Sequence, residues 1–320
     1  MLIASAPGKI HLIGEHAVVY GEPAIIAAIG MRTYVRIENS KNISYTDLAW
    51  PDISHIWNVK KVFGITQRTI ELWNAGSEKK DFSELFNFIK SKKYEGYRAS
   101  VLGIAMKMLG IDKGFSIKVD SKIPTGAGLG SSASRAVAIT KAIGEFFKKK
   151  ISLEKINEIA YQQEKIIHGT PSGGDNTACC FGGLIWFKKA KPKVEEDKSS
   201  SLTELPQEVK VKKKAAEPSS PILAGARVNE IKSLKKEIPY KLKNFVLVYT
   251  KVPEKMTGEL VQMVRQLNED YRNKRIKEIG KLTKEMLEVL KEKDFERMNT
   301  IINLTQKNLT ELGVSCKEID

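Results

Sequence analysis

Short apolar segments occur in the N-terminal half, several of them with alternating β-branched residues, and this pattern predicts β-strands. The expected strands cover residues 2–6, 10–14, 24–30, 33–38 and 115–120. Elsewhere in this half, hydrophobic residues recur at the spacing of an amphipathic helix. The expected helices cover residues 81–92, 97–109, 132–149 and 152–168.

The second half has a different pattern. Residues 188–243 are rich in Lys, Glu, Ser and Pro, which predicts a polar insertion that is partly disordered. A strand is expected at 244–250, and an almost continuous helical pattern follows over 257–312, with breaks near Asn273 and Lys293. Strands and helices in both halves predict an α+β protein of two domains.

Glycine occupies every second position at Gly126, Gly128 and Gly130. Glycines allow a tight turn and let backbone N–H groups approach an anion closely. The serines that follow begin an expected helix, whose positive N-terminal end would face the same anion. The run lacks the Lys of a Walker loop and the spacing of a dinucleotide fingerprint. Alone it could be an ordinary strand-to-helix turn, but it favours a nucleotide phosphate loop.

Three charged or titratable side chains near the N-terminus, those of Lys9, Glu15 and His16, are surrounded by apolar residues. Buried charge is costly unless it is paired or used, so these residues are candidates for a functional site. His11 and His55 have no comparable support and are interpreted as structural.

A third cluster contains two carboxylates. Glu164 lies on the expected helix 152–168, and residues 170–174 must end that helix, so that Asp175 is presented from a turn. Taken singly, an Asp in a glycine-rich turn is more often a turn former than a catalyst. Three clusters in one chain favour the catalytic interpretation.

These motifs together resemble the GHMP kinases. The glycine loop resembles the phosphate loop of the whole superfamily. Similarity to the mevalonate kinases in particular comes from Gly14-Glu15-His16-Ala17-Val18-Val19, residues 168–175 and residues 250–253. The resemblance covers residues 2–37, 96–188 and 244–316. It implies an ATP-dependent enzyme that phosphorylates the primary hydroxyl of mevalonate to 5-phosphomevalonate. Another GHMP kinase, acting on phosphomevalonate or galactose, and a noncatalytic ligand-binding relative are the alternatives.

The resemblance also implies roles for single residues. Asp175 would accept the substrate hydroxyl proton with Lys9 beside it, and Ser132 and Glu164 would bind Mg²⁺ as the cofactor of ATP. Substrate contacts are implied for Glu15, His16 and Thr250. ATP contacts are implied for Lys9, Ser121, Gly126, Ala127, Gly128, Leu129, Gly130, Ser131 and Ser132.

The implied architecture is the two-domain GHMP-kinase fold, with the nucleotide site in the interdomain cleft. The N-terminal domain would cover residues 1–187, the insertion 188–243 and the C-terminal domain 244–320. The glycine-rich motif that the family carries near its C-terminus has no counterpart after Gly313. We therefore expect a truncated C-terminal domain, which leaves open the activity of the chain as written.

Composition limits the partners. The 320 residues carry a formal charge of +15, and much of the excess comes from lysines in 188–243. That segment has no aromatic residue between Ala190 and Ile238 to stack on bases, which argues against nucleic acid. No apolar stretch is long enough for a membrane span, and three cysteines form no disulfide framework, so a soluble cytoplasmic enzyme is expected. The oligomeric state stays open, with a homodimer as one candidate.

Overall fold

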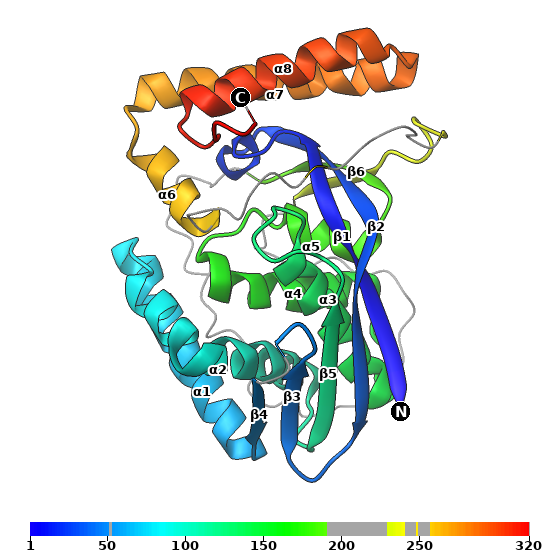
Figure 1. The fold of residues 1–320 in the computed structure, drawn as a ribbon, viewed down its shortest axis with the longest axis vertical. Helices are drawn as coiled ribbons and strands as arrows, with labels where there is room; N and C mark the ends of the chain where they lie inside the picture. Colours follow the sequence, from blue (N-terminus) through cyan, green and yellow to red (C-terminus); the bar gives the residue numbers. More distant parts are fainter. Residues whose placement is uncertain (51–52, 191–228, 241–247, 249–256, 320) are drawn as a thin grey trace, which may run out of the picture.

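The computed structural model describes residues 1–50, 53–190, 229–240, 248 and 257–319. Within these ranges, seven strands form one sheet that runs along the molecule (Figure 1). The strands are β1 (Leu2–Ile13), β2 (Pro23–Asn39), β3 (Ile43–Asp47), β4 (Ser54–Trp57), β5 (Phe115–Ser121), β6 (Leu184–Lys188) and β7 (Glu230–Ser233). Their order is β4-β3-β5-β2-β6-β7, with β1 paired to β2, and only the β3–β5 pair is parallel.

Strands β1 and β2 are longer than the sequence predicted. The pairs of short strands expected at 2–6 and 10–14, and at 24–30 and 33–38, are each one continuous strand, so dividing them was wrong. The pairing shifts register between Pro7 and Gly8 and again between His11 and Ile13. A β-bulge takes up the irregular residues and bends the strand without ending it.

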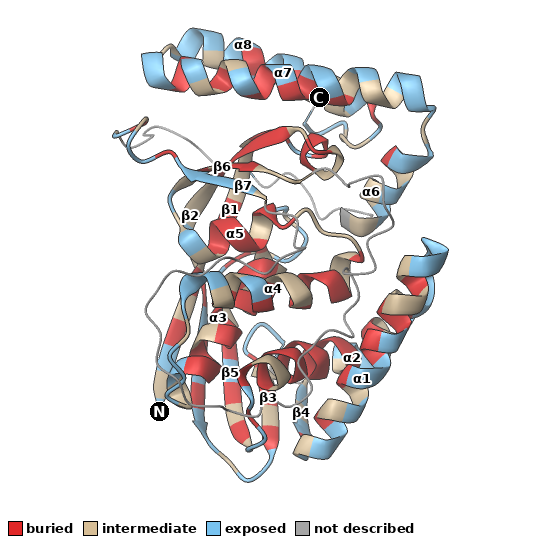
Figure 2. Cartoon of the chain, turned by 180° about the vertical axis from the view of Figure 1, so that it is seen from behind, coloured by how far each residue is buried: buried red, intermediate tan, exposed pale blue. Residues whose placement is uncertain are grey.

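The helices cover one face of the sheet and its two ends. They are α1 (Val59–Lys79), α2 (Ser83–Leu109), α3 (Ser131–Phe146), α4 (Leu153–His168), α5 (Gly174–Phe181), α6 (Thr257–Gln266), α7 (Glu269–Glu292) and α8 (Phe295–Glu311), with a 3-10 turn η1 (Ala17–Tyr20). Helix α3 packs on β1 and β2, α4 packs on α3, and α1 packs on α2. Buried residues concentrate where these helices meet the sheet (Figure 2). The mixture of strands and helices confirms the predicted α+β class.

Several helix predictions are confirmed, and two helices, α1 and α5, were missed. Helix α4 begins after Ser152, whose side chain accepts a hydrogen bond from the backbone N–H of Lys155 as an N-cap. The expected helices 81–92 and 97–109 form α2, whose helical backbone is interrupted between Ser91 and Tyr94. Helix α1 buries Val62, Ile70 and Trp73 together with Thr66 and Thr69, and it was not predicted from the sequence.

Of the two helix breaks predicted in the C-terminal region, one lies at a different position in the structure. Helix α7 begins after Asn268, which accepts a hydrogen bond from the backbone N–H of Tyr271, so the break expected near Asn273 occurs earlier in the chain. The break expected near Lys293 is confirmed, with that residue in the left-handed conformation at φ 60°. Helix α7 packs against β1, β2 and η1 and lies along one end of the sheet (Figure 1).

Part of the polar segment 188–243 is folded. Residues 230–233 form β7 on β6, and Leu234 and Ile238 are buried against Met286 and Leu290 of α7. Most of the predicted insertion and the strand expected at 244–250 lie outside the described residues.

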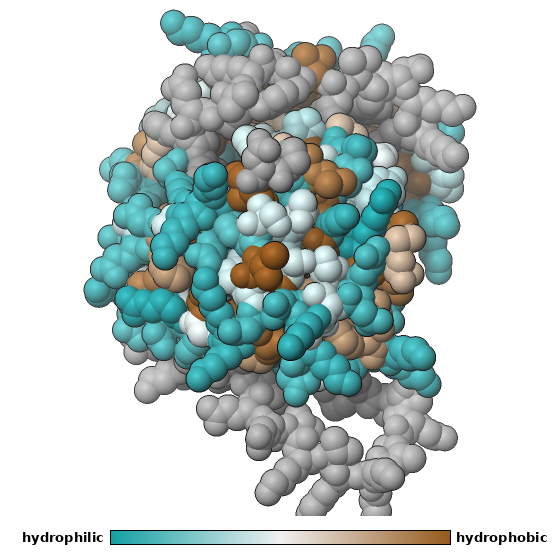
Figure 3. All heavy atoms as spheres, turned by 60° about the horizontal axis from the view of Figure 1, so that its bottom comes forward, coloured by the Kyte–Doolittle hydropathy of each residue, from teal (hydrophilic) through white to brown (hydrophobic). Residues whose placement is uncertain are grey.

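The surface at the end opposite α7 and α8 is largely hydrophilic, with small hydrophobic patches among polar residues (Figure 3). Across the described part of the chain, no helix has both the length and the apolar composition that a membrane span requires.

Candidate active site

The glycine loop lies between β5 and α3, and its backbone explains the glycine spacing. Gly126, Gly128 and Gly130 have φ of 79°, 71° and 72°, a left-handed conformation that side chains with a Cβ rarely adopt. Helix α3 begins at Ser131, directly after the loop. The first N–H groups of a helix have no partner within the helix, so this end suits an anion. The predicted helix start after the loop is confirmed.

Lys9 connects the loop with the rest of the site. It lies on β1 next to the bulge, and its backbone N–H donates a hydrogen bond to the Leu129 carbonyl at 2.9 Å. The contact is close because Gly8 has no side chain: a Cβ there would lie 2.8 Å from the same carbonyl oxygen. The Lys9 ammonium is buried and forms an ion pair with Asp175 Oδ2 at 3.0 Å.

Asp175 belongs to a helix, which corrects the prediction that a turn presents it. Gly173, at φ 92°, is the N-cap of α5, and the backbone N–H of Gly174 donates to Ser172 Oγ at 3.1 Å. These contacts start α5 at Gly174, so Asp175 lies in its first turn, where the helix dipole favours a carboxylate. Burial acts to raise the pKa of Asp175, but the charge and hydrogen bond of the Lys9 ammonium, together with His11 and His168, hold that pKa below its ordinary value.

His11 lies in the same pocket, contrary to its interpretation as a residue outside the site. Its Nδ1 is 3.1 Å from Lys9 Nζ, and its Nε2 is 3.9 Å from Asp175 Oδ1. Burial and the charge of Lys9 lower the pKa of His11 to about 4, which keeps the ring neutral. The period of two along a strand could have identified it, because residues two apart point to the same face.

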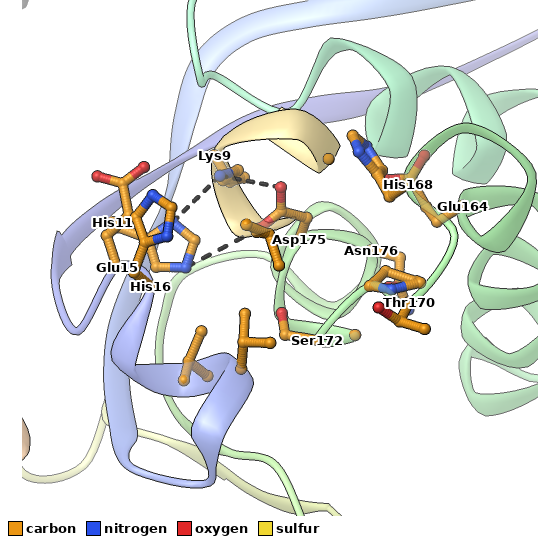
Figure 4. Close-up of a pocket in the computed structure, with 16 residues that line it drawn as sticks. Lys9, His11, Glu15, His16, Glu164, His168, Thr170, Ser172, Asp175 and Asn176 are labelled. Atoms are coloured by element: carbon orange, nitrogen blue, oxygen red, sulfur yellow. Dashed lines mark hydrogen bonds and ion pairs between the residues drawn. The ribbon is translucent and has the colours of Figure 1, made fainter. Parts of the chain in front are cut away.

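Glu164 and His168 lie on the other side of Asp175 from His11 and His16 (Figure 4). Ser132 Oγ, from the first turn of α3, donates a hydrogen bond to Glu164 Oε2 of α4 at 3.1 Å. His168 Nε2 lies 3.3 Å from that hydroxyl and 3.4 Å from that carboxylate oxygen. Burial acts to lower the pKa of His168, but Glu164 outweighs it and raises that pKa.

The donor set of Ser132 and Glu164 fits a magnesium ion. A hydroxyl and a buried carboxylate are hard oxygen ligands, and Mg²⁺ commonly takes few protein ligands and completes its shell with phosphate and water. In the part of the chain that the structure describes, no group of three His, Cys, Asp or Glu side chains forms a complete metal site. These two residues could therefore supply only part of a coordination shell.

The pocket extends away from the glycine loop. Glu15 and His16 lie on its wall at the end of β1, together with Val18 and Val19 of η1. On the other side it is bounded by residues 170–173 and by Gly258 and Val261 of α6. Burial lowers the pKa of His16, against the opposing charge of Glu15.

Of the predicted site residues, Lys9, Glu15, His16, Glu164 and Asp175 line this pocket, whereas Ser121 and the loop residues from Gly126 to Ser132 do not. Ser121, at the end of β5, shares a hydrogen bond of 3.0 Å with the hydroxyl of Thr33 on β2 and does not line the pocket. Thr250 lies outside the described residues. Leu129 is buried, so its contribution to the site is the carbonyl that accepts from Lys9.

Comparison with known proteins assigns the chain to a family. A model of the N-terminal domain of GHMP kinases matches residues 97–183. Mevalonate kinase from Pyrococcus furiosus is 30% identical over 333 residues, an alignment that covers 99% of this chain and 80% of that protein. The enzyme of the same name from Thermococcus sibiricus is 28% identical over 327 residues, with 99% and 80% covered.

Solved structures agree on the fold. A crystal structure of a mevalonate kinase superposes with a TM-score of 0.69 at 24% identity, covering 100% of this chain and 82% of that one. The mevalonate kinase of Methanococcus jannaschii gives a TM-score of 0.69 at 24% identity, with 99% and 81% covered.

The sheet, the glycine loop before α3 and the matched domain define a GHMP kinase, a class of enzymes with ATP as co-substrate. The mevalonate kinase from Pyrococcus furiosus, 30% identical over 80% of its own length, shows to which of these kinases the chain is related. The chain belongs to the mevalonate kinase family.

Proposed function

We propose that the protein transfers the γ-phosphoryl group of ATP to the primary hydroxyl of mevalonate, giving 5-phosphomevalonate and ADP. Membership of the mevalonate kinase family supports the choice of substrate. The observation that carries the proposal is the position of Lys9, whose backbone contacts the glycine loop while its ammonium pairs with Asp175. A single residue thereby joins a candidate phosphate loop to a candidate proton acceptor.

Asp175 acts on the substrate hydroxyl. Because its pKa is held below the ordinary value, the carboxylate is ionised at neutral pH and accepts a hydrogen bond from the hydroxyl. A bond forms between the hydroxyl oxygen and the γ-phosphorus, the bond from that phosphorus to the β–γ bridging oxygen breaks, and the proton passes to Asp175. Phosphoryl transfer depends on alignment and charge stabilisation, and the Lys9 ammonium supplies positive charge next to the reacting oxygen.

The glycine loop binds the nucleotide. Backbone N–H groups from Gly126 to Ser132 and the N-terminal end of α3 point their positive charge toward the phosphates. Ser132 and Glu164 hold Mg²⁺, which neutralises phosphate charge when it is bound. Contacts of ATP with Ser121, and of substrate with Thr250, stay predictions from the sequence.

The substrate occupies the other side of Asp175. Glu15 and His16 provide polar contacts there, and Val18, Val19 and Val261 provide apolar ones. Such a mixed wall suits a small branched hydroxy acid with one apolar side.

The wider assignments are also proposals. We place the domain boundaries at residues 187 and 243, which makes the folded β7 segment part of the insertion. A homodimer and a cytoplasmic location stay predictions.

The test is a substrate panel. ADP release is measured with mevalonate, phosphomevalonate, galactose and homoserine, and the product is identified by mass spectrometry. Turnover of mevalonate to its 5-phosphate supports the proposal. Preferred turnover of another substrate contradicts the specificity. ATP binding by a folded protein with no turnover on any substrate favours the noncatalytic alternative.

A further inference from the structure

The contact between Lys9 and His11 determines which ring nitrogen carries the proton. An ammonium group has three donors and no acceptor, so the His11 nitrogen 3.1 Å from Lys9 Nζ must accept the hydrogen bond. That nitrogen is Nδ1. In a neutral ring the proton then sits on Nε2, and the lowered pKa of His11 agrees with a neutral ring.

The Nε2–H group is a buried donor with nothing to bind. The His11 side chain is only 10% exposed, and Nε2 has no hydrogen-bond partner among the residues that the structure describes. Leaving such a donor unsatisfied is costly, so a buried donor of this kind calls for a partner, such as a water or a ligand atom. His11 lines the pocket, and Asp175 is the carboxylate nearest to this donor.

The distance to Asp175 indicates what fits between them. Nε2 lies 3.9 Å from Oδ1, too far for a direct hydrogen bond, while Oδ2 already pairs with Lys9. One hydroxyl oxygen can bridge this gap, accepting from Nε2–H at about 2.9 Å and donating to Oδ1 at about 2.7 Å.

We propose that His11 is a substrate-binding residue, which holds the reacting hydroxyl jointly with Asp175. The assignment rests on the proposed function for the identity of that hydroxyl. His11 donates to one lone pair of the oxygen, Asp175 accepts the oxygen's proton, and the second lone pair is left to attack phosphorus. Because the two protein groups come from β1 and α5, they fix the direction of attack as well as the position.

Two substitutions of His11 distinguish the role of Nδ1 as an acceptor from the role of Nε2 as a donor. The amide of His11→Asn lies near the position of Nδ1 and can still accept from Lys9, but it provides no donor at the position of Nε2. His11→Gln places its amide near Nε2 and retains that donor. We expect kcat with mevalonate to fall about tenfold in His11→Asn, the loss of one hydrogen bond, and at most about threefold in His11→Gln.

His55→Asn is the matched control. His55 stacks on Trp57 on β4 and does not line the pocket, so its replacement leaves kcat unchanged. Thermal unfolding and ATP binding are measured for all variants to exclude a folding defect. Wild-type kcat in His11→Asn, or equal losses in the Asn and Gln variants, overturns the proposal.

Nitrogen NMR of the histidine rings gives a readout without turnover. The free protein is expected to show His11 as the neutral Nε2–H tautomer, and adding mevalonate without ATP is expected to shift the Nε2 signal. An Nδ1–H tautomer, or no shift at a saturating mevalonate concentration, contradicts the inference. If wild-type protein fails to phosphorylate mevalonate, the proposed function fails, while the tautomer still tests the Lys9–His11 contact.

Discussion

Two glycines of the loop have the same backbone conformation and different surroundings. Gly128 has φ +71° with no atom within 4 Å of a Cβ built on it, whereas Gly130 has φ +72° and its Cβ would lie 2.7 Å from Lys9 Cγ. Alanine at either position would have to adopt the same left-handed conformation, so the conformational destabilisation is the same for both variants. Only Gly130→Ala also presses on the Lys9 side chain.

The two variants therefore differ by the contact with Lys9. A left-handed conformation costs a residue with a Cβ about 1 kcal/mol, which is the full expected effect of Gly128→Ala. Overpacking adds about 1 to 3 kcal/mol, because Lys9 is 4% exposed and held by Asp175 and cannot move freely. We expect Tm to fall by about 2 °C in Gly128→Ala and by about 6 °C in Gly130→Ala.

Thermal unfolding of Gly128→Ala and Gly130→Ala, each alone and each combined with Lys9→Ala, tests the contact between Lys9 and residue 130. Removing the Lys9 side chain also removes the atoms that the new Cβ would meet too closely and leaves only Cys179 Sγ at 3.4 Å, an ordinary contact. In the Lys9→Ala background, Gly130→Ala therefore costs only as much as Gly128→Ala. Such a cycle isolates the pairwise contact. Equal Tm losses for the two glycine variants in the wild-type background would refute the packing of Lys9 on Gly130.

Three further outcomes are expected. Glu164→Gln removes the carboxylate charge at similar size, so the Mg²⁺ concentration for half-maximal turnover rises at least about tenfold; an unchanged requirement contradicts its role as a ligand. Leu234→Ala removes a fully buried side chain and lowers the free energy of unfolding by about 3 kcal/mol, whereas Ile231→Ala, 42% exposed on β7, changes it by less than about 0.5 kcal/mol; equal effects would mean that Leu234 is not packed on α7. The lowered pKa of His11 means that the unfolded chain binds the extra proton, so its contribution to stability is present above the unfolded pKa of 6.5 and is lost as pH falls toward about 4. Urea unfolding should show about 2 kcal/mol more loss in wild type than in His11→Asn between about pH 7 and about pH 5, and parallel pH profiles would contradict it.

Features determined by local backbone geometry could be predicted from the sequence. The glycine loop and the helix starts expected at Ser132 and Ser152, which lie at Ser131 and Leu153 in the structure, each depend on residues within a few positions of one another. Their residue types directly reflect φ angles and unpaired N–H groups.

Features that depend on distant contacts were harder to predict. The helical position of Asp175 depends on the cap formed by Gly173 and Ser172, which the sequence indicated only as a turn. His11 was missed because its importance comes from Asp175, which only tertiary folding brings beside β1. His168 lies in the motif 168–175 that was identified in the sequence, but its contact with Ser132 depends on how α4 packs against α3.

The proposed function depends on Asp175 as the group that accepts the proton of the substrate hydroxyl. Asp175→Asn keeps the shape and removes the charge, so it tests this role most directly when turnover with mevalonate is measured beside ATP binding. We expect kcat to fall by about 10²- to 10⁴-fold while the dissociation constant of ATP changes by less than about threefold. Turnover within a few-fold of wild type by a folded Asp175→Asn protein would contradict it.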